Sequence, residues 1–539
     1  MSNQYDAIVI GAGISGMYQL HKLREQGLSV KVYEAGTGVG GAWYWNKYPG
    51  CRFDSESYTY GYSWSDELLQ EWDYKERFAA QPDTERYLNF VADKFDFRKD
   101  IQFSTRVTKA TYDDANSQWD VELDDGSTAS AEILVSASGP LNAHTLPRIP
   151  GIDSFKGEWA HTARYPKEGF GGRGLDQFKG KRVGVIGTGA TGVQVIQEVA
   201  KTADSLTVFQ LAPEWCAPLK NGPISPEEMK DIKANYKKIF AECNDTFGAF
   251  HHKFDERSAL EVSDEEREAF FEKKYNESGF GIWLGNFHDI MTDQKANDLI
   301  TDFIARKIRS RVNDPKTAEN LIPKDHGFGT RRVPMETKYF ECYNQPNVKL
   351  INLKETPIEE ILPEGVKCSD AMYDLDIIIY ATGFDAVTGS LKRIDITGKE
   401  GVKLTDKWAN GPRTLLGMQT VGFPNLFTLV GPHNGATFCN IPRCIEQNVE
   451  WVSDTVAYMK KNDFHSIEPT LEAEDAWTIH VDQTAEGTLF PTADSWFMGV
   501  NLNDPTKKRT FMLYAGGQQN YRAECDKVAE NDYEGFVLK

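Results

Sequence analysis

The stretch GAGISG, residues 11–16, decides how the first part of the chain folds. The apolar run Asp6–Ile10 before it predicts a short buried strand, and Ser15–Gln26 predicts an amphipathic helix. Ser29–Glu34 predicts the next strand, which ends in an acid. In such a unit the glycines allow a tight turn, a pyrophosphate lies against the helix N-terminus, and the acid binds a ribose diol. We therefore expect a dinucleotide site that includes Glu34.

A second stretch of the same pattern, GTGATG, spans residues 187–192. It follows the apolar run VGVI, opens a predicted helix that continues to Val199, and precedes the predicted strand Ser205–Gln210. No acid ends this strand, because Leu211 and Ala212 come next. Since a carboxylate there would repel a 2′-phosphate, its absence favours NADP over NAD. Folds with two such units usually bind FAD in one and a nicotinamide coenzyme in the other.

The composition changes to long charged helices between about residues 220 and 325, where Ser225 and Ser263 each stand three residues before a Glu, as helix N-caps do. The predicted fold class is α/β, with two dinucleotide-binding (Rossmann-like) domains and an α-helical insertion. The expected boundaries are 1–145 and 386–539 for the two parts of an FAD-binding domain, 146–220 and 326–385 for an NADP-binding domain with its linker, and 221–325 for the insertion.

Charge and cysteine usage limit the class of protein. The net charge of −20 argues against a nucleic-acid partner, which requires clustered Lys and Arg. The eight cysteines form no Cys-x-x-Cys pair, which favours a reducing compartment over a disulfide framework or a metal site. No apolar run is long enough to span a membrane, and no signal peptide is predicted. We expect a cytoplasmic enzyme that binds no metal.

The stretch FKGEWAHTARYP, residues 155–166, predicts neither a regular strand nor a helix. It matches the fingerprint Phe-x-Gly-x-x-x-His-x-x-x-Trp-Pro of the type I Baeyer–Villiger monooxygenases at Phe155, Gly157, His161 and Pro166. GGAWYWNKYPG, IGTGATG, ATGFDAVTGSL, WANGPRTLLG and YEGFVL extend the match over nearly the whole chain. The chain therefore resembles this family, especially its cyclohexanone- and phenylacetone-type members, although Tyr165 replaces the usual Trp and Ala42 the usual Thr.

The resemblance implies an enzyme that inserts one oxygen atom of O2 beside a ketone carbonyl, with FAD and NADP as cofactors and a small-molecule ketone and O2 as partners. A monomer or weak oligomer is expected. In this family a flavin C4a-peroxide attacks the ketone, and a fixed cation stabilises the negative charge. The resemblance assigns that cation to Arg332, in Gly-Thr-Arg-Arg, and assigns Asp54 to hold it. On the residues alone, adjacent arginines are more often a solvated pair, and Asp54 could cap a turn.

The resemblance also assigns binding residues. FAD contacts are expected at Gly11, Gly13, Gly16, Glu34, Gly41, Trp43, Asp54, Tyr60 and Val107. Nicotinamide contacts are expected at Thr188, Gly189, Ala190, Thr191, Gly192 and Arg331. Trp496 is expected to cover cofactor and substrate, and Thr437 and Phe438 to face the substrate, although aromatic residues are more often core. Phe155, Gly157, His161 and Tyr165 would form a linker that shifts between reduction and oxygenation, with His161 as a support.

Three other functions remain open from the sequence. A related monooxygenase would oxidise amines or sulfides, but the fingerprint and Arg332 argue against it. An NADPH-dependent disulfide reductase would use a pair such as Cys439 and Cys444, but such enzymes place the pair soon after the first glycine motif. A non-catalytic flavoprotein sensor would need an effector domain, and none is evident.

One departure from the family concerns the 2′-phosphate of NADPH. The family segment Gln-Arg-Thr-Pro is Gln210-Leu211-Ala212-Pro213 here, so two phosphate donors are missing. Arg331, at the second phosphate-binding position, remains. We expect NADPH to be preferred by a smaller margin than usual, and NADH to support turnover.

Overall fold

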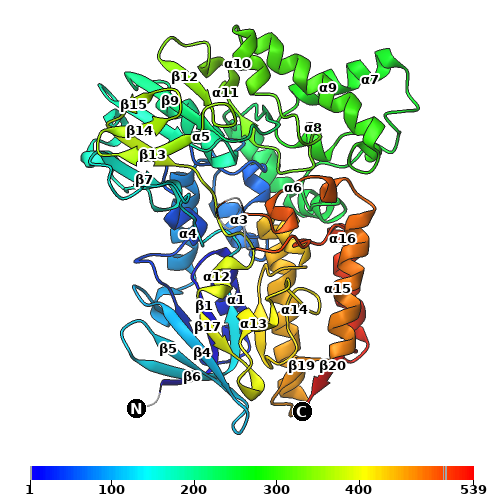
Figure 1. Cartoon of the computed structure of the whole chain (residues 1–539). Helices are drawn as coiled ribbons and strands as arrows, with labels where there is room; N and C mark the ends of the chain where they lie inside the picture. The colour runs from blue at the N-terminus through cyan, green and yellow to red at the C-terminus, as the bar shows by residue number, and fades with distance from the viewer. Residues whose placement is uncertain (1–2, 502, 504–506) are drawn as a thin grey trace.

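The computed structural model describes residues 3–501, 503 and 507–539, without the side chains of Leu175 and Thr437. One large sheet combines the beginning and end of the chain, and a second sheet comes from its middle. In Figure 1 the first sheet lies at the bottom with both termini, the second at the upper left, the helices α7–α9 at the upper right and α10 at the top. The α/β fold with two dinucleotide-type units and a helical insertion is confirmed.

The first sheet has the order β17-β4-β5-β6-β1-β2-β3, and β18 also pairs with β6. Strands β1, β2 and β6 are parallel, so their carboxyl ends meet at one edge, where the first glycine turn follows β1. The strands are β1 Asn3–Ile10, β2 Val30–Tyr33, β3 Ile101–Gln102, β4 Val107–Asp113, β5 Gln118–Leu123, β6 Thr128–Ser136, β17 Asp395–Thr397 and β18 Leu426–Thr428.

The second sheet is parallel throughout and has the order β12-β9-β8-β16-β7. Its strands are β7 Glu158–His161, β8 Arg182–Ile186, β9 Ser205–Gln210, β12 Val348–Asn352 and β16 Ile377–Tyr380. The small antiparallel sheet beside it contains β13 Ile358–Leu362, β14 Gly365–Cys368 and β15 Met372–Asp374. The apolar runs of β8 and β16 are fully buried, as parallel strands covered on both faces require.

The insertion begins and ends its helices where the sequence predicts caps. The hydroxyl of Ser225 accepts a hydrogen bond from the backbone N–H of Glu228, and Ser263 and Glu266 form a reciprocal capping box. Its helices are α6 Pro226–Asn244, α7 Asp264–Asn276, α8 Gly281–Leu284, α9 Gln294–Arg311 and α10 Pro315–Asn320. A pair of short strands, β10 Ala217–Pro218 and β11 Met335–Glu336, ties its two ends together.

The C-terminal part of the chain completes the first unit. Helix α14 packs on α1, β17 extends the first sheet beside β4, and β18 pairs with β6. The helices outside the insertion are α1 Ile14–Glu25, α2 Ala42–Trp45, α3 Asp66–Glu71, α4 Gln81–Lys94, α5 Ala190–Val199, α11 Tyr339–Cys342, α12 Gly389–Lys392, α13 Leu404–Lys407, α14 Ile441–Lys461, α15 Leu471–Glu486 and α16 Gln518–Glu530. Strands β19 Ile467–Pro469 and β20 Phe536–Leu538 pair near the C-terminus.

The stretch 155–166 contains a strand that the sequence did not predict. Glu158–His161 is β7, the edge strand of the second sheet, and it pairs in register with β16. Only its last two residues, Ala160 and His161, are buried, so the strand lacks the apolar run that marks a buried strand. The segment is therefore part of the second sheet and not a free connection.

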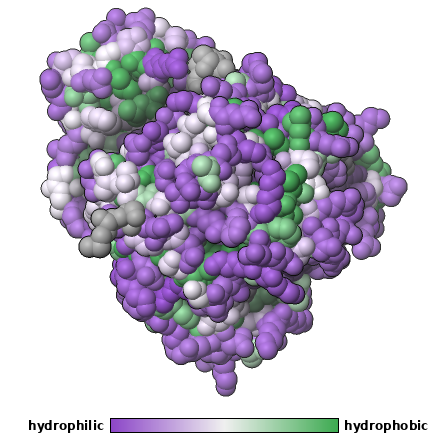
Figure 2. Space-filling model, turned by 90° about the horizontal axis from the view of Figure 1, so that it is seen from below, coloured by the Kyte–Doolittle hydropathy of each residue, from purple (hydrophilic) through white to green (hydrophobic). Residues whose placement is uncertain are grey.

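The molecular surface agrees with the acidic composition. The face shown in Figure 2 is mostly hydrophilic, with scattered hydrophobic residues. Among the helices that the structure describes, none combines the length and apolar character needed to cross a bilayer.

Candidate active site

The first glycine turn joins β1 to α1 and is packed against the segment before α2. Gly11 has a φ of 104°, and a Cβ there would lie 2.7 Å from the carbonyl oxygen of Ala137. Gly13 and Gly41 come so close that a Cβ on Gly41 would lie 2.9 Å from the Cα of Gly13. Gly16 faces the backbone of Gly11 in the same way. Close packing of the turn therefore requires glycine at 11, 16 and 41, and Gly13 stands at the N-cap of α1, the end of a helix that favours a pyrophosphate.

Glu34 follows β2 and lies over this turn. Its carboxylate accepts hydrogen bonds from the N–H groups of Ala12 (2.8 Å) and Gly36 (2.7 Å). Burial raises the pKa of Glu34, and the two N–H groups oppose that shift. Val107, also predicted to contact FAD, begins β4 and is buried in the core beneath the sheet.

Aromatic residues gather beside the turn. Phe53 and Tyr60 are stacked with ring centroids 4.2 Å apart, and Trp43 contacts both edge-on at 5.5 and 5.7 Å. Such surfaces accommodate a flat ring system. The structure thus brings the predicted residues Trp43 and Tyr60 together with Asp54, which follows Phe53 in sequence.

Asp54 and Arg332, which are far apart in sequence, form an ion pair. The arginine Nη2 donates to Asp54 Oδ2 at 2.7 Å, and the Asp54 side chain is only 3% exposed. Burial raises the pKa of Asp54, while the charges of Arg332 and Arg52 lower it. The second oxygen, Oδ1, is buried and has no hydrogen-bond partner within the described chain. A buried acceptor left open at this point fits a donor group of a bound cofactor.

Two aromatic residues that the sequence did not single out position Arg332. Its guanidinium lies 5.1 Å from the ring centroid of Phe280, at the start of α8. Phe280 in turn contacts Trp283, and the indole of Trp283 packs against Gly329, close to Arg332 in the chain. The helical insertion therefore supplies the surface on which the arginine lies. The only sequence signal for this surface is the apolar run Gly-Phe-Gly-Ile-Trp that contains Phe280 and Trp283.

The second glycine turn joins β8 to α5. Gly187 has a φ of 105° and faces the carbonyl of Ala381, and Gly192 faces the backbone of Gly187. Gly189 is different, because no protein atom lies within 4 Å of a Cβ built on it. Any residue can adopt its φ of −71° without strain. Gly189 thus leaves free space at the N-terminus of α5, beside the predicted contacts Ala190 and Thr191.

The segment after β9 lies against this turn. The hydroxyl of Thr188 donates to the carbonyl oxygen of Ala212 at 2.8 Å, and Leu211 is 46% exposed. Arg331 forms ion pairs with Glu214 and Asp325, each at 3.4 Å. The sequence did not predict either acid as part of the site, although Glu214 stands only two residues after Ala212.

The two dinucleotide units are docked at the N-terminal half of α5. The Tyr48 hydroxyl donates to the side-chain oxygen of Gln194 at 2.7 Å, and the Gln194 amide donates to the carbonyl of Arg52 at 3.0 Å. Gly50 packs directly on this helix. The segment that carries Asp54 therefore contacts the second dinucleotide-type unit, and Arg332 reaches Asp54 across the same junction.

The fingerprint residues are structural in this conformation. Phe155 is buried, and a Cβ on Gly157 would lie 2.6 Å from the carbonyl oxygen of Asp376. His161 Nδ1 accepts a hydrogen bond from the N–H of Ala163 at 3.1 Å. Tyr165 donates its hydroxyl to Gln177 at 2.6 Å.

Burial is the main cause that lowers the pKa of His161 to about 3, and the neighbouring His144 is the second. This histidine is neutral near pH 7, which fits support and not proton transfer.

The expected substrate side is lined by aromatic rings. The ring centroid of Phe438 lies 5.4–5.5 Å from those of Trp283, Phe490 and Phe497. Trp496 is half-buried next to Phe497, with centroids 4.6 Å apart. These contacts join the C-terminal part of the chain to the insertion that carries Phe280. The side chain of Thr437 lies outside the described part of the structure.

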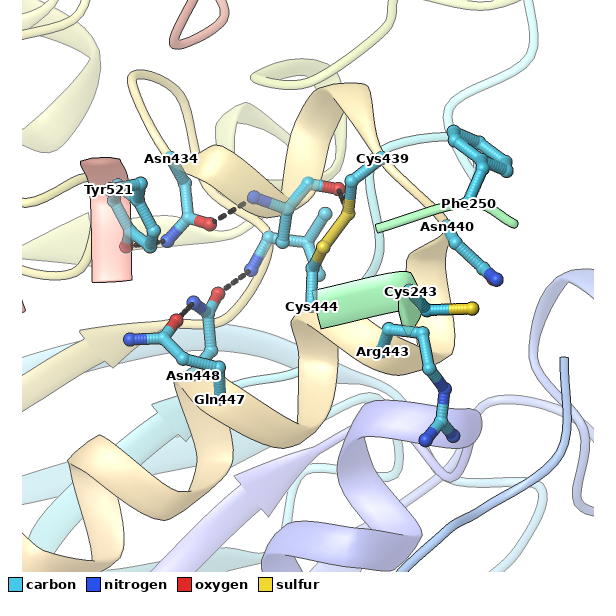
Figure 3. The surroundings of a disulfide bond; sticks show 12 residues. Cys243, Phe250, Asn434, Cys439, Asn440, Arg443, Cys444, Gln447, Asn448 and Tyr521 are labelled. Atoms are coloured by element: carbon cyan, nitrogen blue, oxygen red, sulfur yellow. Dashed lines mark hydrogen bonds between the residues drawn. A yellow bond between two sulfur atoms is a disulfide. The ribbon is translucent and has the colours of Figure 1, made fainter. Parts of the chain in front are cut away.

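Cys439 and Cys444 form a disulfide at the N-terminus of α14 (Figure 3), with Cα atoms 6.6 Å apart. This bond was not expected, because the absence of Cys-x-x-Cys pairs favoured a reducing compartment over a disulfide framework. The pair forms because the first turn of α14 brings the two residues together. Asn440 and Arg443, between them, both bind Thr59, which precedes Tyr60. The other six cysteines are free and buried.

Comparison with known proteins identifies the family. A model of the flavin-binding monooxygenase-like family matches residues 5–219. The chain is 50% identical to 2-oxo-Δ3-4,5,5-trimethylcyclopentenylacetyl-CoA monooxygenase of Pseudomonas putida over 99% of this chain and 98% of that protein. It is 43% identical to a Baeyer–Villiger monooxygenase of Pseudooceanicola batsensis over 99% of this chain and 96% of that one. A crystal structure of OTEMO in complex with FAD and NADP matches with a TM-score of 0.96 and 50% identity, covering 100% of both chains. With two dinucleotide units that meet at the Asp54–Arg332 pair, the chain belongs to the Baeyer–Villiger monooxygenases.

Proposed function

We propose that this protein is an FAD-dependent Baeyer–Villiger monooxygenase that converts a ketone to an ester or lactone. The balanced reaction takes ketone, O2, NADPH and a proton to the ester, NADP⁺ and water. Relatives with monooxygenase and Baeyer–Villiger names, nearly identical in length, support the proposal. When bound, FAD supplies the activation of O2 and the transfer of one oxygen atom.

The observation that carries the proposal is the Asp54–Arg332 pair at the junction of the two units. Arginine keeps its positive charge at all working pH values, so it can stabilise an anion that forms beside it. Asp54 fixes one side of the guanidinium and Phe280 supports its face. The positive charge is therefore held in place before any negative charge appears in the reaction.

Other residues of the chain would bind and orient the reactants. The turn at Gly11–Gly16 and Glu34 would hold FAD, with Gly41, Trp43, Asp54 and Tyr60 around its ring system. The turn at 188–192 and Arg331 would hold NADP. Phe438 and Trp496 would exclude water from the ketone. The proposal places the enzyme in the cytoplasm, where reduced nicotinamide coenzyme is available.

The disulfide argues against an NADPH-dependent disulfide reductase. Cys444 is fully buried and Cys439 is 8% exposed, so an external disulfide substrate has little access to the pair. Thiol–disulfide exchange requires direct contact between the sulfur atoms.

The deciding experiment measures NADPH consumption by the FAD-loaded protein with cyclohexanone, and separately with oxidised glutathione. We expect consumption of O2 and formation of a lactone in amounts equal to the ketone lost. NADPH-dependent reduction of glutathione without a lactone would overturn the proposal. A panel of linear, cyclic and aryl ketones then defines the substrate range, and the same assay with an amine and a sulfide tests the related monooxygenase activities.

A further inference from the structure

The two dinucleotide units of this chain can be compared with each other residue by residue. In the first, the acid that follows the second strand, Glu34, lies over the glycine turn and binds the N–H of Ala12. In the second, the segment that follows β9 also reaches its glycine turn, through the hydrogen bond from Thr188 to Ala212. This segment carries an acid as well, but it stands four residues after β9, at Glu214.

We infer that Glu214 sets the coenzyme preference of this enzyme and makes NADH an effective reductant beside NADPH. The inference rests on the proposed function only in requiring a nicotinamide coenzyme at the second unit. It assigns the carboxylate of Glu214 to the edge of the adenine ribose, where a free 2′-hydroxyl can donate a hydrogen bond to it.

The charges around Arg331 carry the inference. Arg331 would be the cation that holds a 2′-phosphate, but two carboxylates, Glu214 and Asp325, already pair with it at 3.4 Å. The three side chains together carry one net negative charge. A phosphate dianion must therefore compete with Glu214 for the guanidinium, and Leu211 at the mouth of the site offers no donor.

The open hydrogen-bonding positions are consistent with use of both coenzymes. Oε2 of Glu214 is buried without a hydrogen bond, and Nε2 of His326 lies 3.4 Å from it. Nε of Arg331 is also buried without an acceptor among the described residues. Both side chains keep part of their surface exposed, 14% for Arg331 and 19% for Glu214, so a ribose hydroxyl of NADH or the 2′-phosphate of NADPH can approach the pair.

The test compares Glu214→Gln with the parent and with Glu268→Gln. Glutamine keeps the size of the side chain and removes its charge. Glu268 lies on α7 and pairs with Arg306, so its variant changes the net charge equally without touching the coenzyme site. Anaerobic stopped-flow reduction of bound flavin, followed over a range of NADPH and NADH concentrations, gives the apparent Kd and the limiting rate for each.

We expect the parent to reduce flavin with both coenzymes. Glu214→Gln should change the ratio of the two Kd values in favour of NADPH by about ten- to a hundredfold, the size of one hydrogen bond to a charged group. The limiting rates should stay the same, because the nicotinamide end is unchanged, and Glu268→Gln should match the parent. A ratio that stays within about twofold, or moves towards NADH, would overturn the role of Glu214. Rejection of NADH by the parent would overturn the inference as a whole.

These outcomes are separable from those that concern the proposed function. Flavin reduction is measured without O2 or ketone, so it reports on Glu214 even if no ester forms. Reduction by both coenzymes without ester formation would refute the Baeyer–Villiger activity alone. If neither coenzyme reduces the flavin, both proposals fail.

Discussion

Replacing Gly189 with alanine tests the nicotinamide site most directly, because the protein itself gives no reason for a glycine there. Its φ of −71° and ψ of −173° suit alanine, and no protein atom lies within 4 Å of the added methyl group. The folded state should therefore tolerate the change. Since alanine reduces the conformational entropy of the unfolded chain, the free energy of unfolding should rise slightly, by up to about 1 kcal/mol.

The cost should appear only when NADPH binds. A methyl group at the N-terminus of α5 would occupy the space through which a pyrophosphate approaches the backbone. Loss of one charge-assisted hydrogen bond of about 1.5–3 kcal/mol weakens NADPH binding by about ten- to a hundredfold. Flavin reduction at increasing NADPH concentrations measures the Kd, and the absorbance of the purified protein near the flavin band measures FAD content.

Two further variants control this experiment. Gly192→Ala would drive a methyl group into the carbonyl of Gly187, so it should lower the melting temperature, unlike Gly189→Ala. Gly13→Ala has only an ordinary contact, 3.4 Å from the Cα of Gly41, and should lose FAD while the fold persists. An unchanged Kd for NADPH in Gly189→Ala would refute the assignment, and loss of FAD in that variant would show that the two sites are exchanged.

Arg332→Ala should leave FAD bound and reducible by NADPH but abolish ester formation, because the cation is needed only when negative charge develops. Stopped-flow reduction of the flavin together with lactone analysis measures both effects, and lactone formation at near the parent rate would refute the role of Arg332. The double variant Leu211→Arg, Ala212→Thr should restore two donors for the 2′-phosphate, lower the KM for NADPH about tenfold and leave the KM for NADH nearly unchanged. Steady-state kinetics with each coenzyme measure the two KM values, and an equal fall in both would argue against a 2′-phosphate contact. Burial lowers the pKa of His161 to about 3 and that of His433 to about 4, below their ordinary value of 6.5. The unfolded chain therefore takes up protons below pH 6.5 that the folded protein does not, so the free energy of unfolding should fall as the pH drops from about 6.5 to 4, by up to about 1.4 kcal/mol per pH unit for each histidine. Calorimetry between pH 7 and 5 measures the fall, and His433→Gln should make it shallower; an equal slope in the variant would show that other groups are responsible.

The local elements of the fold were predictable from the sequence where short-range patterns determine them. Strand β9 has the predicted bounds, and the caps at Ser225 and Ser263 begin α6 and α7 as expected. Strand β7 was missed because an edge strand of four residues has too short an apolar pattern to be recognised. Its partner, β16, lies more than 200 residues away, so no local signal marks the pairing.

The site shows the same division. Asp54 and Arg332 were expected to act together through the family resemblance, and the structure brings them to 2.7 Å. Phe280 beneath the arginine and the Cys439–Cys444 bond depend on tertiary packing, which a linear pattern does not reveal. Glu214 was overlooked because an acid that binds the ribose was expected directly at the end of β9, and Glu214 stands four residues further on. The pair that it forms with Arg331 exists only because the chain returns to β9 after the helical insertion.

The split first sheet has a consequence for the order in which a growing chain can fold. Strand β6 is made early, yet its neighbour β18 and the helix α14 that covers α1 are more than 290 residues further on. The second sheet is complete once β16 has left the ribosome. During synthesis the middle of the protein can therefore reach its final structure first, while the earlier segment waits with an uncovered helix face. Chains released after residue 192 but before residue 426 would contain both glycine turns but lack the strand and the helix that close the first unit.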